Sequence, residues 1–579
     1  MFNKFPEIKV KGPLINESWQ GYESIQKELL YQLSNNENMK TIVIDCYPGV
    51  RYDEIKTKLI NGLDANLVIC SDDLAYSGEK ITTLIERNLT DDRVFGVLSC
   101  HTLEEFFDMN QIQDARKKIE DHNGIVVVYG VGASLVTKGD ILIYADLARW
   151  EIQQRYRSKE LGNWKVDNHE EDSLRKHKRA FFVEWKVSDR HKKTLYNDIH
   201  YYLDTNEKDN AKMISGKAFL EGLRQTVHQP FRLVPYFDSG VWGGQWMKEK
   251  LGLDPAKENY AWSFNGVPEE NSLFLRYGDV KIEIPAINAV FKHPVELLGD
   301  KVYGRFGAEF PIRFNFLDTF GGQNLSLQVH PMIDYVQEKF GVHYTQDESY
   351  YIMDAEENSI VYLGTKDGVD QDEMIKELYE SYEEGHIFND QKYINQFPAK
   401  KHDHFLIPAG TIHSQGKNSL VLEISSTPNY FTFKMWDWGR LGMDGLPRPV
   451  HLEHGVNSIQ WERDETWVKQ NLNNQVEIVA EGDGWYEEKT GLHERQFIET
   501  RRHWFSKKVL HNTNGGVNVL NLIEGEEAII ESPTNAFEPY IVHYAETFII
   551  PECVKEYTIK PYGKSEGKEI ATIKAFIRV

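Results

Sequence analysis

Four residues in this chain have the types and the spacing of a metal site. In QNLSLQVH, Gln328 and His330 stand two positions apart; in IPAGTIH, His413 follows a Pro-Ala-Gly turn; Glu348 begins ESYYIM between them. Alternate residues of a strand share a face, so Gln328 and His330 point the same way on an extended chain. Two imidazoles, a carboxylate and an amide oxygen form an N/O ligand set that suits zinc.

An ordinary structural role is the alternative for each of these histidines. The chain has 20 histidines, and a single histidine is more often a surface or hydrogen-bonded residue than a ligand. His330 and His413 differ from the others because each lies at a strand edge or a turn within apolar, β-rich sequence. Spacing alone leaves both interpretations open.

A longer stretch around these residues resembles a known family. From about residue 235 to 459 the chain is similar to the type I mannose-6-phosphate isomerases, which are zinc-dependent cupin enzymes. The matching segments follow one another in order: VWGGQWMKEKLG (241–252), LDTFGGQNLSLQVHP (317–331), ESYYIMDAEENSIVYLG (348–364), FLIPAGTIHSQGKNSLVLEIS (405–425) and WDWGRLGMDGLPRPVHLEHGVNSI (436–459). The resemblance implies one zinc ion per chain, held by Gln328, His330, Glu348 and His413.

The resemblance also implies a reaction, the interconversion of mannose 6-phosphate and fructose 6-phosphate. A base must remove a proton from carbon 2, and the resulting enediol oxygen must be stabilised. Zinc with an open coordination position can polarise the carbonyl, and an acid or base must lie within hydrogen-bond reach. The substrate phosphate needs cationic or amide donors some distance away.

The sequence departs from the family pattern around the metal ligands. Gln346 stands where the family commonly has a lysine, and Lys434 stands where it has an arginine. The family's ESWE-type phrase appears as AWSFNG at 261–266, without its glutamate. Lys434 is therefore our first candidate for electrostatic stabilisation or proton transfer, with an exposed strand-edge lysine as the alternative.

Three further residues complete the expected site. Arg440, assigned with Lys434 to the catalytic set, and Arg448, assigned to substrate binding, are candidates for contacting phosphate; structural ion pairs are the alternative for both. Ser326 shares its strand face with Gln328 and is expected to touch the substrate, unless it is an ordinary cross-strand hydroxyl.

Residues 1–232 are expected to form a separate α/β domain with a largely parallel sheet, because apolar runs alternate with helix-like segments. The runs are TIVIDC (41–46), NLVIC (66–70), VFGVLSC (94–100), GIVVVYG (124–130) and DILIYAD (140–146). This part loosely resembles the nucleoside-kinase group of P-loop folds. Its phosphate loop looks decayed, because CYPGVRYDE has one glycine and no lysine.

Period-2 patterns after residue 232 predict cupin-type β-barrels. Residues 233–459 are expected to form the metal-binding barrel, with a helical insertion at about 369–400 in which Met374, Leu378 and Tyr382 are core. Residues 460–579 are expected to form a metal-free barrel that closes the chain. The predicted fold class is thus multidomain, an α/β P-loop kinase-like domain followed by all-β cupin barrels.

Composition limits the partners. The net charge of −23, from 66 basic and 89 acidic residues, argues against nonspecific nucleic-acid binding and against an anionic membrane surface. The N-terminus lacks the apolar core of a signal peptide, and no apolar run is long enough to cross a membrane. With four cysteines that form no CxxC motif, we expect a cytoplasmic protein.

Three functions remain open at this stage. The first is an active zinc isomerase whose partner is a small hexose phosphate. The second is a metal-binding sugar-phosphate sensor or regulator with impaired catalysis, which Gln346 and Lys434 favour. The third is a bifunctional protein with a nucleotide-binding N-terminal domain, against which the missing P-loop lysine counts.

Overall fold

Five parallel strands form the centre of one of the two units into which the chain divides. The computed structural model describes residues 1–36, 39–491 and 493–578. This unit comprises Pro6–Thr226 and Pro268–His293. Its seven-stranded sheet has the order β2-β8-β7-β6-β3-β5-β4, with β2 Ser18–Gln20, β8 Lys212–Ser215, β7 Tyr201–Asp204, β6 Ile141–Asp146, β3 Thr41–Cys46, β5 Val126–Gly130 and β4 Leu67–Cys70.

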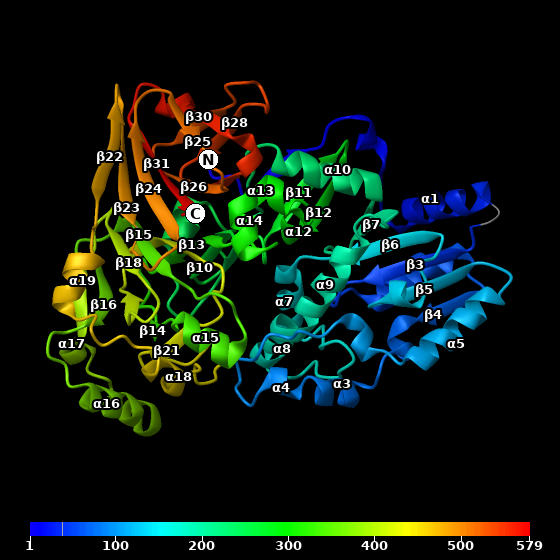
Figure 1. Ribbon diagram of the computed structural model, residues 1–579, viewed down its shortest axis with the longest axis horizontal. Coiled ribbons are helices and arrows are strands. Elements are labelled where there is room, and N and C mark those ends of the chain that lie inside the picture. Colours follow the sequence, from blue (N-terminus) through cyan, green and yellow to red (C-terminus); the bar gives the residue numbers. More distant parts are fainter. Residues whose placement is uncertain (37–38, 492, 579) are drawn as a thin grey trace. The chain divides into compact units, whose positions relative to one another are not determined.

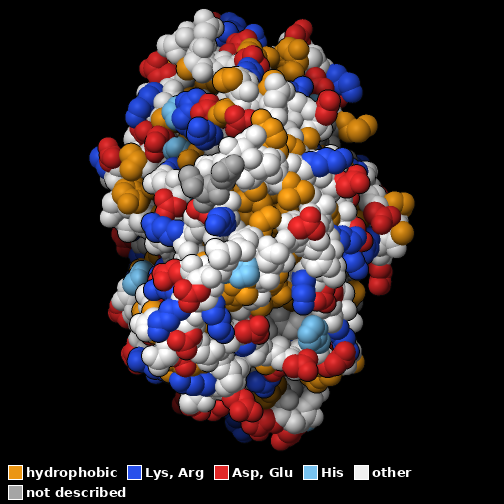
Figure 2. All heavy atoms as spheres, turned by 90° about the vertical axis from the view of Figure 1, so that its right-hand side faces the viewer, with side chains coloured by type: hydrophobic (Ala, Val, Ile, Leu, Met, Phe, Trp, Pro, Cys, Tyr) orange, Lys and Arg blue, Asp and Glu red, His pale blue; other side chains and the backbone are white. Residues whose placement is uncertain are grey.

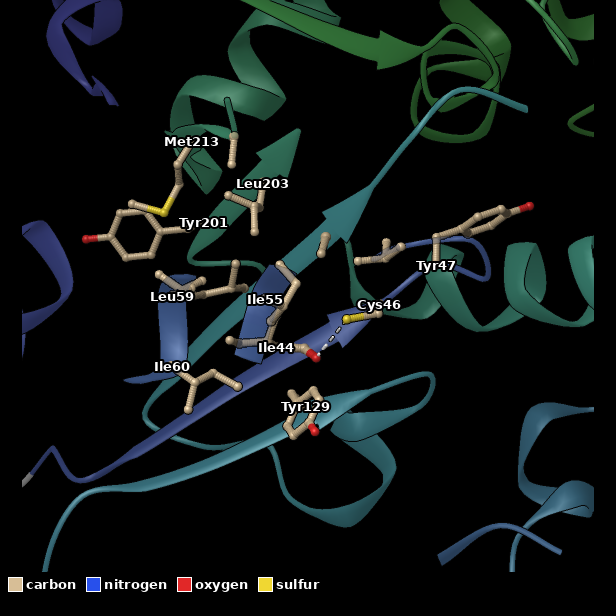
Figure 3. Close-up of a cluster of buried hydrophobic side chains, with 14 of the residues drawn as sticks. Ile44, Cys46, Tyr47, Ile55, Leu59, Ile60, Tyr129, Tyr201, Leu203 and Met213 are labelled. Atoms are coloured by element: carbon tan, nitrogen blue, oxygen red, sulfur yellow. Dashed lines mark hydrogen bonds between the residues drawn. The ribbon is translucent and has the colours of Figure 1, made fainter. Parts of the chain in front are cut away.

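The central strands β3, β5 and β6 are apolar along almost their whole length because both faces of the sheet are covered. Figure 3 shows part of this core, in which Ile44, Leu203 and Met213 meet side chains of the helical segment that follows β3. Acidic and basic side chains are interspersed over the face drawn in Figure 2. The P-loop kinase resemblance of this unit stays a prediction.

One expected strand of this unit does not form. Residues 94–100 (VFGVLSC) lie outside the sheet, although they are as apolar as the true strands. Their amide groups bond to helical neighbours instead: Val97 N to Asn88 O at 2.8 Å and Ser99 N to Phe182 O at 2.9 Å. Apolar composition thus located a buried segment here, but it did not identify the hydrogen-bond partner that decides between strand and loop.

The second unit comprises Met1–Phe5, Val227–Val267 and Pro294–Val579, and it is built mainly from antiparallel sheets (Figure 1). Two sheets include the residues expected to bind metal, in the orders β18-β15-β20-β13-β10-β9 and β17-β16-β19-β14-β21. Their strands are β9 Tyr236–Asp238, β10 Trp262–Gly266, β13 Ile312–Asp318, β14 Leu327–Val329, β15 Glu348–Ala355, β16 Ile360–Thr365, β17 Ile394–Pro398, β18 His404–Ile407, β19 His413–Gln415, β20 Ser419–Ser426 and β21 Phe433–Trp436.

Two further sheets follow in the sequence, in the orders β22-β23-β24-β31-β26-β29 and β25-β30-β27-β28. They enclose their own apolar core. Their strands are β22 Glu477–Gly482, β23 Trp485–Gly491, β24 Ile498–Phe505, β25 Val509–Asn512, β26 Asn518–Glu524, β27 Glu527–Glu531, β28 Tyr540–His543, β29 Thr547–Ile550, β30 Glu556–Pro561 and β31 Ile570–Ile577.

The helical insertion consists of α16 (Gln371–Glu384) and α17 (Asp390–Tyr393). Met374 and Leu378 of α16 are buried, whereas Tyr382 is 62% exposed and is not part of the core. The three-domain division stays a prediction; residues 268–293, placed by sequence in the metal-binding part, contribute β11 (Ser272–Tyr277) and β12 (Val280–Pro285) to the unit with the parallel sheet. No helix among the described residues has the length and apolarity needed to cross a membrane.

A buried arginine fixes the turn that precedes β19. Arg463 is 1% exposed, and its Nη1 donates to Pro408 O at 2.8 Å, to Ala409 O at 2.6 Å and to Thr411 Oγ1 at 2.5 Å. The amide of Gly410 donates to His330 O at 2.8 Å. One side chain thus holds the Pro-Ala-Gly turn against the strand that leads to His330.

Replacing Arg463 with Met should destabilise the protein by roughly 2–4 kcal/mol, because three buried acceptors lose their charged donor. Calorimetric melting should show a transition lowered by several degrees. The matched control is Lys469→Met, which removes an exposed ion pair with Glu465 and should shift the melting temperature little. Equal melting temperatures for Arg463→Met and the control would contradict the role given to this arginine.

Candidate metal centre

Strand pairing places three polar side chains on one face of the smaller of the two sheets. Gln328 on β14 is the Cα partner of His413 on β19 and of Lys434 on β21. Directly opposed residues of antiparallel strands project to the same side of the sheet. Gln328, His413 and Lys434 therefore share a face, although 106 positions separate the first from the last.

Three potential ligands converge on one point. His330 lies directly after β14, and its Nε2 is 2.6 Å from Glu348 Oε2. His413 Nε2 lies 3.8 Å from the same oxygen. The ligand atoms of His330, Glu348 and His413 are all within 4.8 Å of one another, and all three residues are buried. Gln328 completes the group, with its Nε2 3.2 Å from His413 Nε2.

Main-chain carbonyls fix the tautomer of both imidazoles. His330 Nδ1 donates to Phe431 O at 3.2 Å, and His413 Nδ1 donates to Thr411 O at 2.8 Å. A ring whose Nδ1 carries the proton presents a lone pair at Nε2, the form in which imidazole binds a metal. Burial also lowers the pKa of both His330 and His413 to about 4, so both rings are neutral near pH 7.

The donor set fits a divalent cation. Burial raises the pKa of Glu348, and its Oε1 has no hydrogen-bond partner among the described residues. A buried carboxylate oxygen of this kind is costly unless a positive charge compensates it. Gln328 would offer its amide oxygen after a flip of the amide, since Nε2 now faces His413. Two neutral nitrogens, a carboxylate and an amide oxygen are ligands that zinc accepts.

The other expected site residues lie in two places. Ser326 Oγ donates to Gln328 Oε1 at 3.1 Å, so it orients an expected ligand. Arg440 and Arg448 both form ion pairs with the carboxylate of Asp437, and Arg440 Nη1 also donates to Asn324 O at 2.7 Å. Their guanidinium groups hold the segment after β21 in this structure, the structural role kept open above.

A second buried carboxyl group, which the sequence reasoning missed, lies beside the cluster. Glu423 on β20 is the Cα partner of Tyr350, two residues after Glu348 on the same face of β15. Its oxygens accept from Arg313 Nη1 at 3.2 Å and from Asn315 Nδ2 at 3.0 Å. Burial and the nearby Glu348 raise its pKa. One signal pointed to it: an acidic residue in the otherwise apolar strand SLVLEIS.

Gln346, noted above as a departure from the family pattern, lies between the two carboxyl groups. Its Nε2 donates to Glu348 Oε2 at 3.3 Å and approaches Glu423 Oε1 at 3.5 Å. An amide here bridges two acids without adding a charge. A lysine in its place would bring a positive charge within reach of both carboxyl groups.

In the unit with the parallel sheet, Asp45 near the end of β3 and Arg51 in the segment after it both have side-chain partners. Arg51 pairs with Glu160, and the carboxylate of Asp45 accepts from Ser134 N at 2.9 Å and lies 3.1 Å from His191 Nε2. These contacts fit the turn and structural roles of such residues.

Comparisons with known proteins find different matches for two parts of the chain. A family model described as "Domain of unknown function (DUF8485)" matches residues 21–228. Mannose-6-phosphate isomerase of Streptococcus mutans is 24% identical over 231 residues, which cover 40% of this chain and 67% of the relative. Mannose-6-phosphate isomerase ManA of Bacillus subtilis is 24% identical over 238 residues, covering 40% and 68%.

Among solved structures, the crystal structure of mannose 6-phosphate isomerase from Bacillus subtilis aligns with a TM-score of 0.48 at 20% identity, covering 60% of this chain and 99% of that one. By sequence, one part of the chain is similar to proteins named mannose-6-phosphate isomerases, and another part matches a family whose function is undescribed.

Proposed function

We propose that this protein is a zinc-dependent aldose–ketose isomerase that interconverts mannose 6-phosphate and fructose 6-phosphate. The observation that carries the proposal is the convergence of His330 Nε2, His413 Nε2 and Glu348 on one point, with both imidazole tautomers set by backbone carbonyls. The relatives named mannose-6-phosphate isomerase support the choice of substrate.

His330, His413, Glu348 and, after an amide flip, Gln328 would hold the zinc ion. When bound, zinc supplies Lewis acidity for the sugar carbonyl and its neighbouring hydroxyl. The Ser326 hydroxyl, which donates to Gln328 Oε1 before the flip, would accept from Gln328 Nε2 after it and hold the amide in that orientation. The carbonyls of Phe431 and Thr411 keep the two imidazoles from turning away.

Proton transfer at carbon 1 and carbon 2 is assigned to Glu423 and Lys434. Glu423 shares the inward face of the larger sheet with Glu348, and burial raises its pKa, which makes it a stronger base than an exposed carboxylate. Lys434 shares a face with Gln328 on the facing sheet and supplies positive charge near the developing enediolate.

Binding of the substrate phosphate is assigned to Arg448 and Arg440. Both guanidinium groups contact Asp437. Arg448 pairs with it through Nε, whereas Arg440 also donates to Asn324 O and Asp437 O, so Arg448 would supply most of the N–H groups for a phosphate. Asp437 would hold the two arginines side by side, and a phosphate would then be shared between them.

The first prediction concerns metal content. The purified protein should contain about one zinc ion per chain, and His413→Ala and His330→Ala should each lose it, because the three ligands that remain include only one imidazole and bind weakly. The matched control is His404→Phe, a fully buried histidine on β18 outside the cluster. Plasma mass spectrometry of the dialysed variants measures the metal; zinc retained by His413→Ala would remove this site from the proposal.

The second prediction concerns turnover. Wild-type protein loaded with zinc should convert mannose 6-phosphate, and Glu423→Gln and Lys434→Met should each lower kcat by about 10²–10⁴-fold, as expected for loss of a proton-transfer or charge-stabilising group. Zinc content should stay unchanged in both, which separates chemistry from metal loss. Lys417→Met, at an exposed lysine, serves as the control.

A coupled assay that reports fructose 6-phosphate measures the rates. A zinc-loaded wild-type protein that binds mannose 6-phosphate in calorimetry but leaves it unconverted would replace the isomerase by a sensor of the same ligand. Failure to bind any hexose phosphate would exclude both the isomerase and the sensor.

A further inference from the structure

The last two sheets of the chain carry a polar group of side chains on an otherwise apolar inner face. On β24 and β31, Phe505 is the Cα partner of Ile570, and both belong to the core of these sheets. Two residues from Phe505 on the same face, His503 lies opposite Glu487 of β23. The inner face therefore changes from apolar to polar along the strands.

The facing sheet contributes a second histidine. His511 on β25 is the Cα partner of Tyr557 on β30, and its ring stacks on that tyrosine at 5.2 Å between centroids and 10° between planes. The centroid of His511 also lies 4.7 Å from that of His503. The two imidazoles thus meet between the sheets, one from each.

These side chains line a cavity of about 150 Å³, which has room for several water molecules. Aromatic and aliphatic groups form part of its wall, and the polar groups form the rest. The lining includes Trp485, Glu487, His503, His511, Lys574 and Phe576. Ligand pockets commonly combine apolar and aromatic walls with a few polar groups in this way.

The histidines in this cavity have unused hydrogen-bonding capacity. His503 is 4% exposed and His511 is 5% exposed. Within the described part of the chain, three ring nitrogens lack a hydrogen-bond partner: both nitrogens of His503 and Nε2 of His511. Native proteins satisfy nearly all buried polar atoms, so three orphaned nitrogens at one cavity indicate a polar occupant.

Charges around the cavity are balanced, which constrains that occupant. Glu487 lies 3.5 Å from Lys574 Nζ and 3.3 Å from Arg501 Nη1, and Arg501 also pairs with Glu499 at 2.7 Å. Lys574 and Arg501, the two cations of the lining, are thus each paired with a carboxylate, Glu487 in the lining and Glu499 outside it, so an anion such as phosphate would have to compete with these pairs. Among the described residues, these histidines belong to no close cluster of three metal ligands, and Lys574 opposes a bound cation.

Neutral imidazoles can each donate one hydrogen bond and accept another. Burial lowers the pKa of His503 to about 4, so the neutral form prevails near pH 7. A hydroxyl group matches this pair of roles because it also donates and accepts. Aromatic walls such as Trp485 and Phe576 suit the C–H faces of a sugar or polyol.

We propose that the cavity between β24, β25 and β31 binds an uncharged polyhydroxylated ligand, a monosaccharide or a small polyol, through His503 and His511. This site is separate from the metal centre, and the proposal does not depend on isomerase activity. The ligand proposed for this cavity carries no phosphate, unlike the hexose phosphate assigned to the metal centre.

Calorimetric titration of the full chain with D-mannose and with D-mannitol tests the proposal. We expect at least one of these probes to bind, and His511→Phe and His503→Phe to weaken its binding by about tenfold or more, since each removes hydrogen bonds while keeping an aromatic ring. His413→Ala, which disables the metal centre, should bind the probe as wild type does. His404→Phe controls for the loss of a buried histidine elsewhere.

Three results would overturn the proposal: no binding of either probe, binding lost in His413→Ala but retained in His511→Phe, or His511-dependent binding of inorganic phosphate or zinc instead of the neutral probes. Melting curves verify that the variants fold. Should a variant not fold, crystals of wild-type protein grown with the bound probe decide the matter, because the probe either lies against His503 and His511 or lies elsewhere.

Discussion

The metal centre depends on the hydrogen bonds of a single turn, Pro408 to Thr411. The amide of Gly410 binds the carbonyl of His330, and the amide of Ala409 binds Asp347 Oδ1 at 2.9 Å. The carbonyl of Thr411 accepts from the ring of His413. Two segments distant in sequence, one ending at His330 and one leading to Glu348, are thereby tied to the turn that precedes His413, and Arg463 holds that turn through its carbonyls.

This arrangement lowers one energetic cost of the site, the ordering of its side chains. A buried carboxylate also carries a desolvation cost, which a bound cation would offset, but holding each ligand in one rotamer carries a separate entropic cost. Backbone bonds that fix the rings in advance remove that freedom, so the entropy of ordering the ligands is met by folding and not by binding.

The sequence singled out residues that the structure brings together, because their signals are local. Strand alternation placed Gln328, and the Pro-Ala-Gly turn marked the start of the strand that begins with His413. The partnership of Gln328 with Lys434 depends on long-range register, which no local pattern reveals. Glu423 was missed because a single acid in an apolar strand looks like an edge position until the facing strands are known. Tyr382 was misplaced because helical spacing identifies a stripe of residues without fixing how far the buried part extends.

The division of the chain has a consequence for how it is made. The unit with the parallel sheet takes Pro6–Thr226 and then Pro268–His293, while the other unit starts at Met1–Phe5 and resumes at Val227. Neither unit is one continuous stretch. During synthesis the parallel sheet can form early, but the β1 strand (Glu7–Lys9) has no partner until β11 has left the ribosome. The unit with the parallel sheet therefore becomes complete only after residues 227–267 of the other unit have been synthesised.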